Sequence, residues 1–434
     1  MFFLRLLRYF YIFFKRHFFI FVSGNSDFSK MKLNSIYKEI SLDNSYLNEE
    51  FENKFSKLIG SGKSLTYAAA RMGLYHLLKE LGIGKNDEVI LLGSTCSVMP
   101  NAIIRTGATP IYSDVDKETF GSSLSGIKNC ISKNTKVIIA QHSYGIPCEI
   151  DKIKDFLKDK NIFLVEDCAL TVGSKIKNKN VGTFGDAAIF SFDHTKPINL
   201  FMGGVLYTEN VQLFEKLKNS WKKIENIPVY RQKKIWKEFI FENKFFRNNI
   251  AAKGFFISKL RSFFRKIFFI KSPFLDDDFG TSYISDYPYP ARMPSFLCSI
   301  GLEEIKNFKE FSEAKKVFLK NFIKLIKESS IEDILPKSYL NDRLDIIPSR
   351  ICFQINNGSD FRKRLRFLID VDSTWFLEPI IVRNEPLKNF LYNAGSCKNS
   401  EEIGPKMINI PVSNSKHINE LLLKKLKKFL FLLN

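Results

Sequence analysis

The sequence predicts an α/β fold organised around a mainly parallel, doubly wound sheet. First, strand-length apolar runs alternate with segments of helical periodicity as far as Gly204. Second, two of these runs, Ile162–Val165 and Ala187–Phe192, are each followed within four residues by a charged side chain. Third, a chain of 434 residues is long enough for a large core and two domains.

Each predicted element follows from its local pattern. Leu65–Leu81 has the apolar periodicity of a helix, and Gly82 is a suitable stop. Short apolar runs between turn signals predict three strands: Glu88–Leu92, Thr109–Asp114 and Val137–Gln141. A helical pattern over Met99–Gly107 lies between the first two. Toward the C-terminus the pattern predicts a long helix from about Pro294, short strands near Ser349–Gln354 and a closing helix from Ile418.

The charge balance indicates an anionic partner. The chain has 66 Lys and Arg residues against 46 Asp and Glu, a formal net charge of +20. Such a surface suits nucleic acid, an anionic membrane or phosphorylated substrates. No zinc-finger, homeodomain or RNA-binding motif is present, so we expect no nucleic-acid partner. The seven cysteines contain no CxxC pair, which predicts reduced cytoplasmic thiols and neither disulfides nor a metal site.

Residues 1–30 form a basic, aromatic segment that stands apart from the rest. Met1–Gly24 contains no acid, and its apolar residues are interrupted too often for a span that crosses a bilayer. On a helix, its four cations would fall within one arc: Arg5, Arg8, Lys15 and Arg16. This predicts a helix lying in the membrane interface, peripheral and on the cytoplasmic side, with packing against protein as the alternative.

A second segment, residues 231–275, repeats this chemistry. Arg231–Ser272 interleaves cations with Phe pairs and contains two acids, Glu238 and Glu242. We interpret it as an insertion that meets the same anionic lipid surface. The alternative is an insertion packed on the protein itself, with solvated lysines.

Asp167 and Lys196 follow the two strand-like runs and carry the chemistry. The carboxyl ends of parallel strands share one rim of a sheet, so both side chains are expected there. A lysine and a carboxylate suit pyridoxal phosphate (PLP), which needs an amine for a Schiff base and an acid beside its ring nitrogen. By itself the pair is also consistent with a surface lysine and a helix-capping aspartate.

The motifs around this pair are more specific. VEDCA, VGTFGDAAIFSF, TK and GG occur in that order between Val165 and Gly204, after GIGKNDEVIL, NAIIRTGATPIYSDVD and QHSYGIP. From about Leu74 to Gly204 the chain resembles the DegT/DnrJ/StrS sugar aminotransferases, which are fold-type I PLP enzymes. The resemblance implies an aspartate-aminotransferase-like, three-layer α/β/α large domain over residues 31–290. It further implies a smaller α+β domain over residues 291–434, and a homodimer.

The resemblance also implies roles for individual residues. Lys196 would bind PLP covalently and then act as general acid and base, and Asp167 would pair with the ring nitrogen. Ser191 would bind the phosphate together with the start of the first helix, where Ala69, Ala70 and Arg71 replace the family's Ser-Gly-Thr. Arg71 either supplies a charged phosphate ligand or is a surface arginine.

Several positions depart from the family pattern. Cys96 stands where an aromatic residue often stacks on the cofactor ring, and Leu170 where a Gln usually packs. Pro290 replaces an Asn that reaches the partner's cofactor phosphate in relatives. His142 and Tyr144 match positions near the substrate, although a hydrogen-bonded structural histidine would give the same pattern.

The expected function is transfer of an amino group, with glutamate as donor, to a keto-sugar linked to a nucleotide or a lipid. The product would enter surface polysaccharide or glycoconjugate synthesis. One alternative is a PLP-dependent sugar dehydratase, which the retained Lys196 disfavours. Another is a membrane-associated relative without catalysis, which the altered phosphate residues favour and the retained Asp167 and Lys196 oppose.

Overall fold

The computed structural model describes residues 33–42, 44–245, 251–268, 287–365, 369, 371, 378–383 and 385–430. The predicted membrane segment at residues 1–30 lies outside these ranges, as does part of the predicted 231–275 insertion. Among the helices within these ranges, none is both long and apolar enough to cross a membrane.

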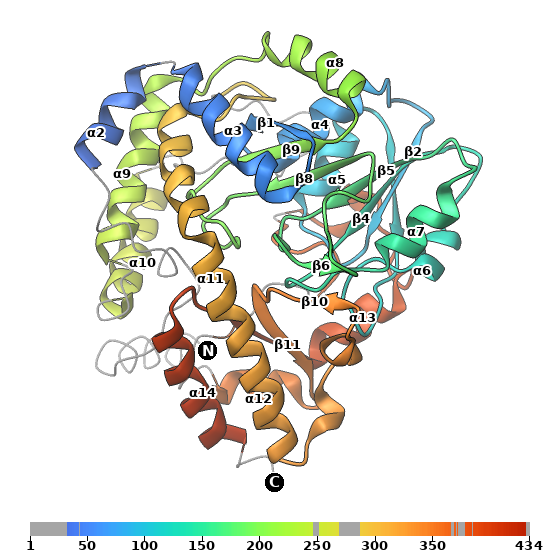
Figure 1. Ribbon diagram of the computed structural model, residues 1–434, viewed down its shortest axis with the longest axis vertical. Coiled ribbons are helices and arrows are strands. Elements are labelled where there is room, and N and C mark those ends of the chain that lie inside the picture. Colours follow the sequence, from blue (N-terminus) through green and yellow to red (C-terminus); the bar gives the residue numbers. More distant parts are fainter. Residues whose placement is uncertain are drawn as a thin grey trace.

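A seven-stranded sheet forms the centre of the large, N-terminal part (Figure 1). In pairing order its strands are β1 (Lys63–Tyr67), β9 (Gly204–Thr208), β8 (Ala187–Ser191), β5 (Phe163–Asp167), β4 (Thr135–Gln141), β2 (Glu88–Leu92) and β3 (Thr109–Ser113). β9 pairs antiparallel with its two neighbours, and the other pairings described in this sheet are parallel. The predicted mainly parallel sheet is confirmed.

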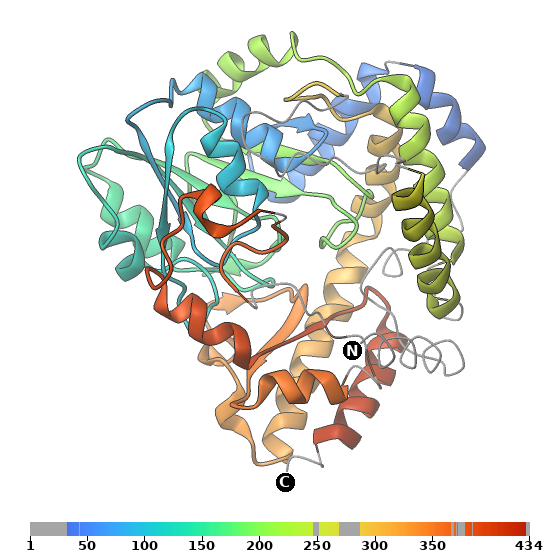
Figure 2. The same cartoon turned by 180° about the vertical axis from the view of Figure 1, so that it is seen from behind.

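Helices cover both faces of the sheet because successive strand side chains point to opposite sides. Val89 and Leu91 of β2 join one core with α4 (Ala70–Glu80), α5 (Val98–Ile104) and α8 (Val211–Trp221). Ile90, which lies between them, joins a separate core with α6 (Leu124–Lys128) and α7 (Ile150–Leu157). The predicted three-layer α/β/α arrangement is therefore confirmed (Figures 1 and 2).

The predicted helix over Leu65–Leu81 is wrong at its start. Residues up to Tyr67 form β1, and α4 begins only at Ala70. Leu65 of β1 pairs with Leu206 of β9, so a long-range backbone ladder overrides the local helical periodicity. The correction places the first turn of α4 directly after a strand of the central sheet.

The C-terminal part has a core of its own. The 34-residue helix α11 (Ser295–Glu328) contributes Phe296 to the core of the large part and Phe322 to the C-terminal core. The C-terminal core also contains the antiparallel pair β11 (Arg350–Gln354) and β12 (Met407–Pro411), with α12 (Gly358–Leu365), α13 (Lys398–Lys406) and α14 (Lys416–Leu430). The boundary predicted at residue 291 falls just before α11 and remains a prediction.

The remaining elements are short or peripheral. The N-terminal helices are α2 (Leu33–Lys38), η3 (Glu39–Ser41) and α3 (Ser45–Ile59), and the 231–275 segment contributes to α9 (Val229–Phe245) and α10 (Ala251–Ile267). A three-stranded sheet consists of β10 (Leu344–Asp345), β6 (Lys175–Ile176) and β7 (Lys179–Asn180). Three 3₁₀ turns complete the set: η4 (Glu332–Ile334), η5 (Lys337–Leu340) and η6 (Leu387–Phe390).

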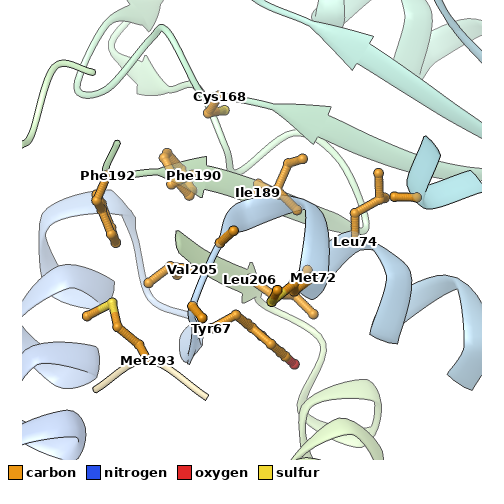
Figure 3. Close-up of a cluster of buried hydrophobic side chains, with 14 of the residues drawn as sticks. Tyr67, Met72, Leu74, Cys168, Ile189, Phe190, Phe192, Val205, Leu206 and Met293 are labelled. Atoms are coloured by element: carbon orange, nitrogen blue, oxygen red, sulfur yellow. The ribbon is translucent and has the colours of Figure 1, made fainter. Parts of the chain in front are cut away.

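An apolar cluster fixes α4 against the sheet (Figure 3). Met72 and Leu74 of α4 pack with Ile189 of β8 and Leu206 of β9, and all four are nearly inaccessible to solvent. Burial of each such side chain contributes about 1.5–3 kcal/mol to stability. This packing determines where the N-terminus of α4 lies relative to the ends of the strands.

Glu52 generates a testable prediction, because it is a buried carboxylate beneath β1. Its Oε1 accepts hydrogen bonds from the N–H and the hydroxyl of Thr66, both at 2.7 Å, and burial raises its pKa from 4.5 to about 7. A raised pKa in the folded state means that the free energy of unfolding falls as pH rises from about 4.5 to about 7. Glu52→Gln keeps both acceptor contacts and should remove this loss, so it should be more stable than the parent by about 3 kcal/mol above pH 7. Urea unfolding at pH 5 and pH 8 tests this, and a pH-independent difference would contradict it.

Candidate active site

The carboxyl ends of β4, β5 and β8 lie at one rim of the sheet. These strands are adjacent and parallel, and they end at Gln141, Asp167 and Ser191. Lys196 lies in the loop that leads from β8 to β9 at the same rim. The sheet therefore brings Asp167, Ser191 and Lys196 to one region, as the sequence predicted.

The loop carrying Lys196 is fixed at both ends by backbone hydrogen bonds. The Phe192 N–H donates to the Gly203 carbonyl at 3.0 Å, and the Leu200 N–H donates to the Phe192 carbonyl at 3.0 Å. The Lys196 N–H donates to the Asp193 carbonyl at 2.9 Å, which forms a turn around the lysine. These bonds present the lysine in a defined position.

The surroundings of Lys196 favour a neutral amine. Burial is the largest influence and lowers the pKa of Lys196, and the positive charge of Arg350 lowers it further. Asp193, Cys96 and Asp167 act in the opposite direction and raise this pKa. A lysine must be neutral to act as a nucleophile or a base. This lysine therefore has the electrostatic setting of a reactive amine.

Glu166 and Asp167 are adjacent in sequence but differ in their surroundings. The Glu166 carboxylate accepts backbone N–H groups from Gly182, Phe184 and Gly185 at 2.6–2.8 Å. Asp167 is also buried, and its Oδ1 accepts the N–H of Ala169 at 2.9 Å. Burial raises the pKa of Asp167, a shift that the Ala169 hydrogen bond and the charge of Lys196 reduce. Glu166 is thus a structural anchor, and Asp167 is a buried acid at the rim.

His142 and Tyr144 lie in the protein interior. His142 Nδ1 accepts the N–H of Cys148 at 3.0 Å, so Nε2 carries the proton and donates to Glu166 at 3.0 Å. Tyr144 is fully buried, and its ring packs against Phe120 at 5.9 Å. The structural reading of His142 accounts for both of its ring nitrogens. A substrate contact of either residue remains a prediction.

The N-terminus of α4 lies beside the end of β8 and the start of β9. Ala69 forms a bridge with Gly203, and Gly204 approaches so closely that a Cβ built on it would lie 2.2 Å from the Ala70 nitrogen. Glycine is needed there because the two backbones meet without room for a side chain. Ser191 and Arg71 are both half-buried, and Ser191 pairs with Gly204 across β8 and β9, which brings it close to the first turn of α4.

Cys96 pairs with a short segment of the C-terminal part, residues 380–382. Cys96 forms a bridge with Ile381, whose N–H donates to the Thr95 carbonyl at 2.9 Å. Ile380 and Val382 have φ values of 49° and 59°, a left-handed conformation that is strained for β-branched residues. Cys96 remains half-buried, without the flat surface that an aromatic ring would offer.

Arg350 is a site residue that the sequence analysis missed. It is the first residue of β11, its exposed fraction is 2%, and its charge acts on Lys196. The preceding residue, Ser349, donates its N–H to the Tyr144 carbonyl at 3.0 Å, which joins β11 to the loop after β4. The available signal was an arginine at the start of an apolar strand, where a buried cation requires a partner or a function.

The contrast between Glu166 and Asp167 can be tested by matched substitutions. Glu166→Gln would turn an NH₂ group toward backbone N–H donors, so it should cost about 3 kcal/mol of stability. Asp167→Asn keeps an oxygen for the Ala169 N–H and removes a buried charge, so stability at neutral pH should be unchanged or higher. Urea unfolding of both variants measures this, and equal destabilisation would contradict the assigned roles.

Comparison with known proteins identifies relatives of this chain. The chain is 39% identical over 206 residues to GDP-perosamine synthase of Escherichia coli O157:H7. The matched stretch covers 48% of this chain and 56% of the relative. It is 32% identical over 170 residues to the spore coat polysaccharide biosynthesis protein SpsC of Bacillus subtilis. This second matched stretch covers 39% of this chain and 44% of SpsC. The matched segment thus spans about half the length of these curated relatives.

Solved structures share the fold over nearly the whole chain. An aminotransferase from Psychrobacter cryohalolentis has a TM-score of 0.68 at 16% identity, over 92% of this chain and 96% of that one. The aminotransferase TlmJ from Streptoalloteichus hindustanus has a TM-score of 0.68 at 18% identity, over 96% and 99%. A family model, that of the DegT/DnrJ/EryC1/StrS aminotransferases, matches residues 27–420. The chain belongs to the DegT/DnrJ/EryC1/StrS aminotransferase family.

Proposed function

We propose that this chain is a PLP-dependent aminotransferase that transfers the amino group of glutamate to a nucleotide-linked keto-sugar. The observation that carries the proposal is the convergence of Lys196 and Asp167 at one rim of the parallel sheet. Burial lowers the pKa of Lys196 and raises that of Asp167, so the two groups have the shifted pKa values typical of a reactive site.

The residues at the rim fit pyridoxal phosphate in three respects. Lys196 supplies an amine with a lowered pKa for the aldehyde. Asp167 is a buried carboxylate, which a protonated ring nitrogen would stabilise as a counter-ion. Ser191, Arg71 and the first-turn N–H groups of α4 suit the phosphate. When bound, the cofactor supplies an electron sink for the carbanion that forms at the substrate.

Lys196 has two roles in this proposal. Its Nζ would hold the cofactor covalently, and as a free amine it would carry the proton that moves during amino transfer. The lowered pKa serves both roles, because an ordinary lysine would be protonated at neutral pH. Asp167 keeps the ring nitrogen protonated while the backbone bond to Ala169 fixes the direction of its carboxylate.

We further propose that Arg350 binds the carboxylate of the amino donor. The donor reacts through its amino group at the position of Lys196, and its carboxylate lies one carbon away. The charge of Arg350 acts on Lys196, which supports a place for its guanidinium near the reacting amine. An arginine forms bidentate hydrogen bonds with a carboxylate, and burial strengthens them.

The substrate class rests on the relatives. The similarity to GDP-perosamine synthase supports a nucleotide-linked keto-sugar as the acceptor, and the similarity to SpsC supports a role in polysaccharide or glycoconjugate synthesis. A lipid-linked acceptor would fit if the chain lies on a membrane. The identity of the sugar is a matter for substrate profiling.

Covalent labelling tests the proposed function. Borohydride treatment of PLP-loaded protein should fix the label on Lys196, and glutamate should change the absorbance of the loaded protein. Asp167→Asn should slow the half-reaction with glutamate by about a hundredfold or more, while PLP is retained. A label on another lysine would overturn the assignment. A labelled protein that never exchanges amino groups would instead indicate a dehydratase or a relative without catalysis.

Arg350 gives a second test with two separate readouts. Arg350→Met should raise the KM for glutamate by at least about tenfold, since a charged hydrogen-bond partner is lost. The same variant should raise the pKa of Lys196, because a neighbouring positive charge disappears, and PLP incorporation should then require a higher pH. Arg350→Lys keeps the charge, so it should preserve the pH profile while still weakening glutamate binding. An unchanged KM in Arg350→Met would refute the proposed contact.

We also propose a homodimer and peripheral attachment to the cytoplasmic face of an anionic membrane. The dimer is expected from the family and from the frequency of isologous pairs among oligomers. An active species with the mass of one chain in light scattering would contradict it. The attachment is supported by the basic, Phe-rich composition of residues 1–30 and 231–275.

A further inference from the structure

Helices α9 and α10 form an antiparallel pair at the outer edge of the molecule in both views (Figures 1 and 2). α9 is anchored to the body of the protein. The ring of Trp236 contacts that of Phe296 in α11 at 5.9 Å, and the ring of Phe239 contacts that of Phe201, in the loop that carries Lys196, at 6.3 Å. α9 thus connects α10 to the core of the large part.

The arginines of α10 point toward α9. Arg261 donates two hydrogen bonds to Glu238 of α9, at 2.7 and 3.3 Å, and Arg265 donates one at 2.7 Å. Glu238 has an exposed fraction of 6%, and the guanidinium of Arg261 also lies 4.0 Å above the ring of Phe241. These cations therefore hold the two helices together.

Apolar residues in the second half of α10 and directly after it face solvent. Five of them follow the spacing i, i+3, i+4, i+7 and i+8, which places them on one face of a helix. Their exposed fractions are 46–66%: Leu260, Phe263, Phe264, Ile267 and Phe268. The Phe264 ring contacts the rings of Phe263 and Phe268, at 5.9 and 6.3 Å, so the stripe is continuous. This inverts the usual order of an amphipathic helix on a protein surface.

On the described residues of α9 and α10, the exposed charge is positive. Within the described residues of α9 and α10, the two acids are Glu238 and Glu242, and both have an exposed fraction of 6%. The exposed charged residues of α9 are lysines: Lys233, Lys234, Lys237 and Lys244. An apolar stripe next to a row of cations without acids is complementary to an anionic bilayer, which has phosphates outside and acyl chains inside.

We propose that the outer stripe of α10, residues 260, 263, 264, 267 and 268, inserts among the acyl chains of an anionic bilayer. The lysines of α9 would lie at the lipid phosphates. A second copy of the chain fits less well as the occupant, because pairing two such faces would bring the same lysines together on proteins of net charge +20. The inference rests on the proposed peripheral attachment and identifies the surface that makes it.

Depth-dependent quenching tests the insertion in the full-length chain. The probes are phosphatidylcholine vesicles with and without phosphatidylglycerol, prepared with brominated acyl chains that quench tryptophan. Phe264→Trp should add a tryptophan whose emission these lipids quench severalfold on anionic vesicles. Leu340→Trp, a matched control on an exposed residue in η5, should add an emission that they leave unchanged.

A second set of variants measures the contribution of the stripe to binding. The triple variant Phe263→Ser, Phe264→Ser, Ile267→Ser should reduce the partition of the chain onto anionic vesicles at least tenfold. The control Val211→Ser, Leu340→Ser, Leu391→Ser removes exposed apolar residues elsewhere and should leave the partition unchanged. Melting temperature and aminotransferase activity should be retained in both, which excludes misfolding.

The outcomes separate the two proposals. A chain that does not bind anionic vesicles overturns the peripheral attachment and, with it, the role of α10. The role of α10 alone is overturned if the triple variant still binds and the tryptophan of Phe264→Trp is not quenched. Another part of the chain would then make the attachment. The chain could also self-associate in the absence of vesicles, and the triple variant could abolish that self-association. This result would show that a second copy of the chain covers the stripe, and it would refute the lipid proposal. None of these results depends on the assigned chemistry of Lys196.

Discussion

The Glu166 carboxylate joins β5 to the loop that enters β8 and to the residue that follows β4. It accepts three backbone N–H groups from the loop before β8 and the Nε2 proton of His142 after β4, while it lies in β5 itself. A buried carboxylate with four donors is satisfied and resists displacement. Because Asp167 is the next residue, its direction and its distance from the Lys196 loop depend on this anchor.

The proposed active site is a small set of charged side chains that are buried or half-buried. Lys196, Asp167 and Arg350 come from the sheet of the large part and from β11 of the C-terminal part. Burial is unfavourable for each of these charges. Their opposite effects are seen in the pKa of Lys196, which Asp167 raises and Arg350 lowers. A cofactor with a phosphate and a cationic ring, and a donor with a carboxylate, would supply counter-charges to all three. The site is thus arranged for anionic and zwitterionic ligands.

The α9–α10 pair shows how burial of one acid can reverse the orientation of a helix. Composition alone led us to expect that residues 231–275 meet an anionic lipid surface or pack on the protein itself. Glu238 draws Arg261 and Arg265 inward, and the phenyl rings occupy the outer face. The lysines of α9, which are not drawn toward a buried acid in this way, remain outside. The surface that results is more apolar than a helical projection of the sequence suggests.

The sequence by itself determined the layered α/β class, most strand positions of the sheet and the pair Asp167 and Lys196, because apolar periodicity and strand-end residues are local properties. Only the tertiary structure decided that residues 65–67 form a strand, since β1 depends on its pairing with β9 far along the chain. It also decided that His142 donates a hydrogen bond to Glu166, and that the charge of Arg350 acts on Lys196 from another part of the fold. These outcomes depend on which distant groups share a low-dielectric environment. Local sequence does not encode that proximity, because it arises only when the sheet, α11 and β11 pack together.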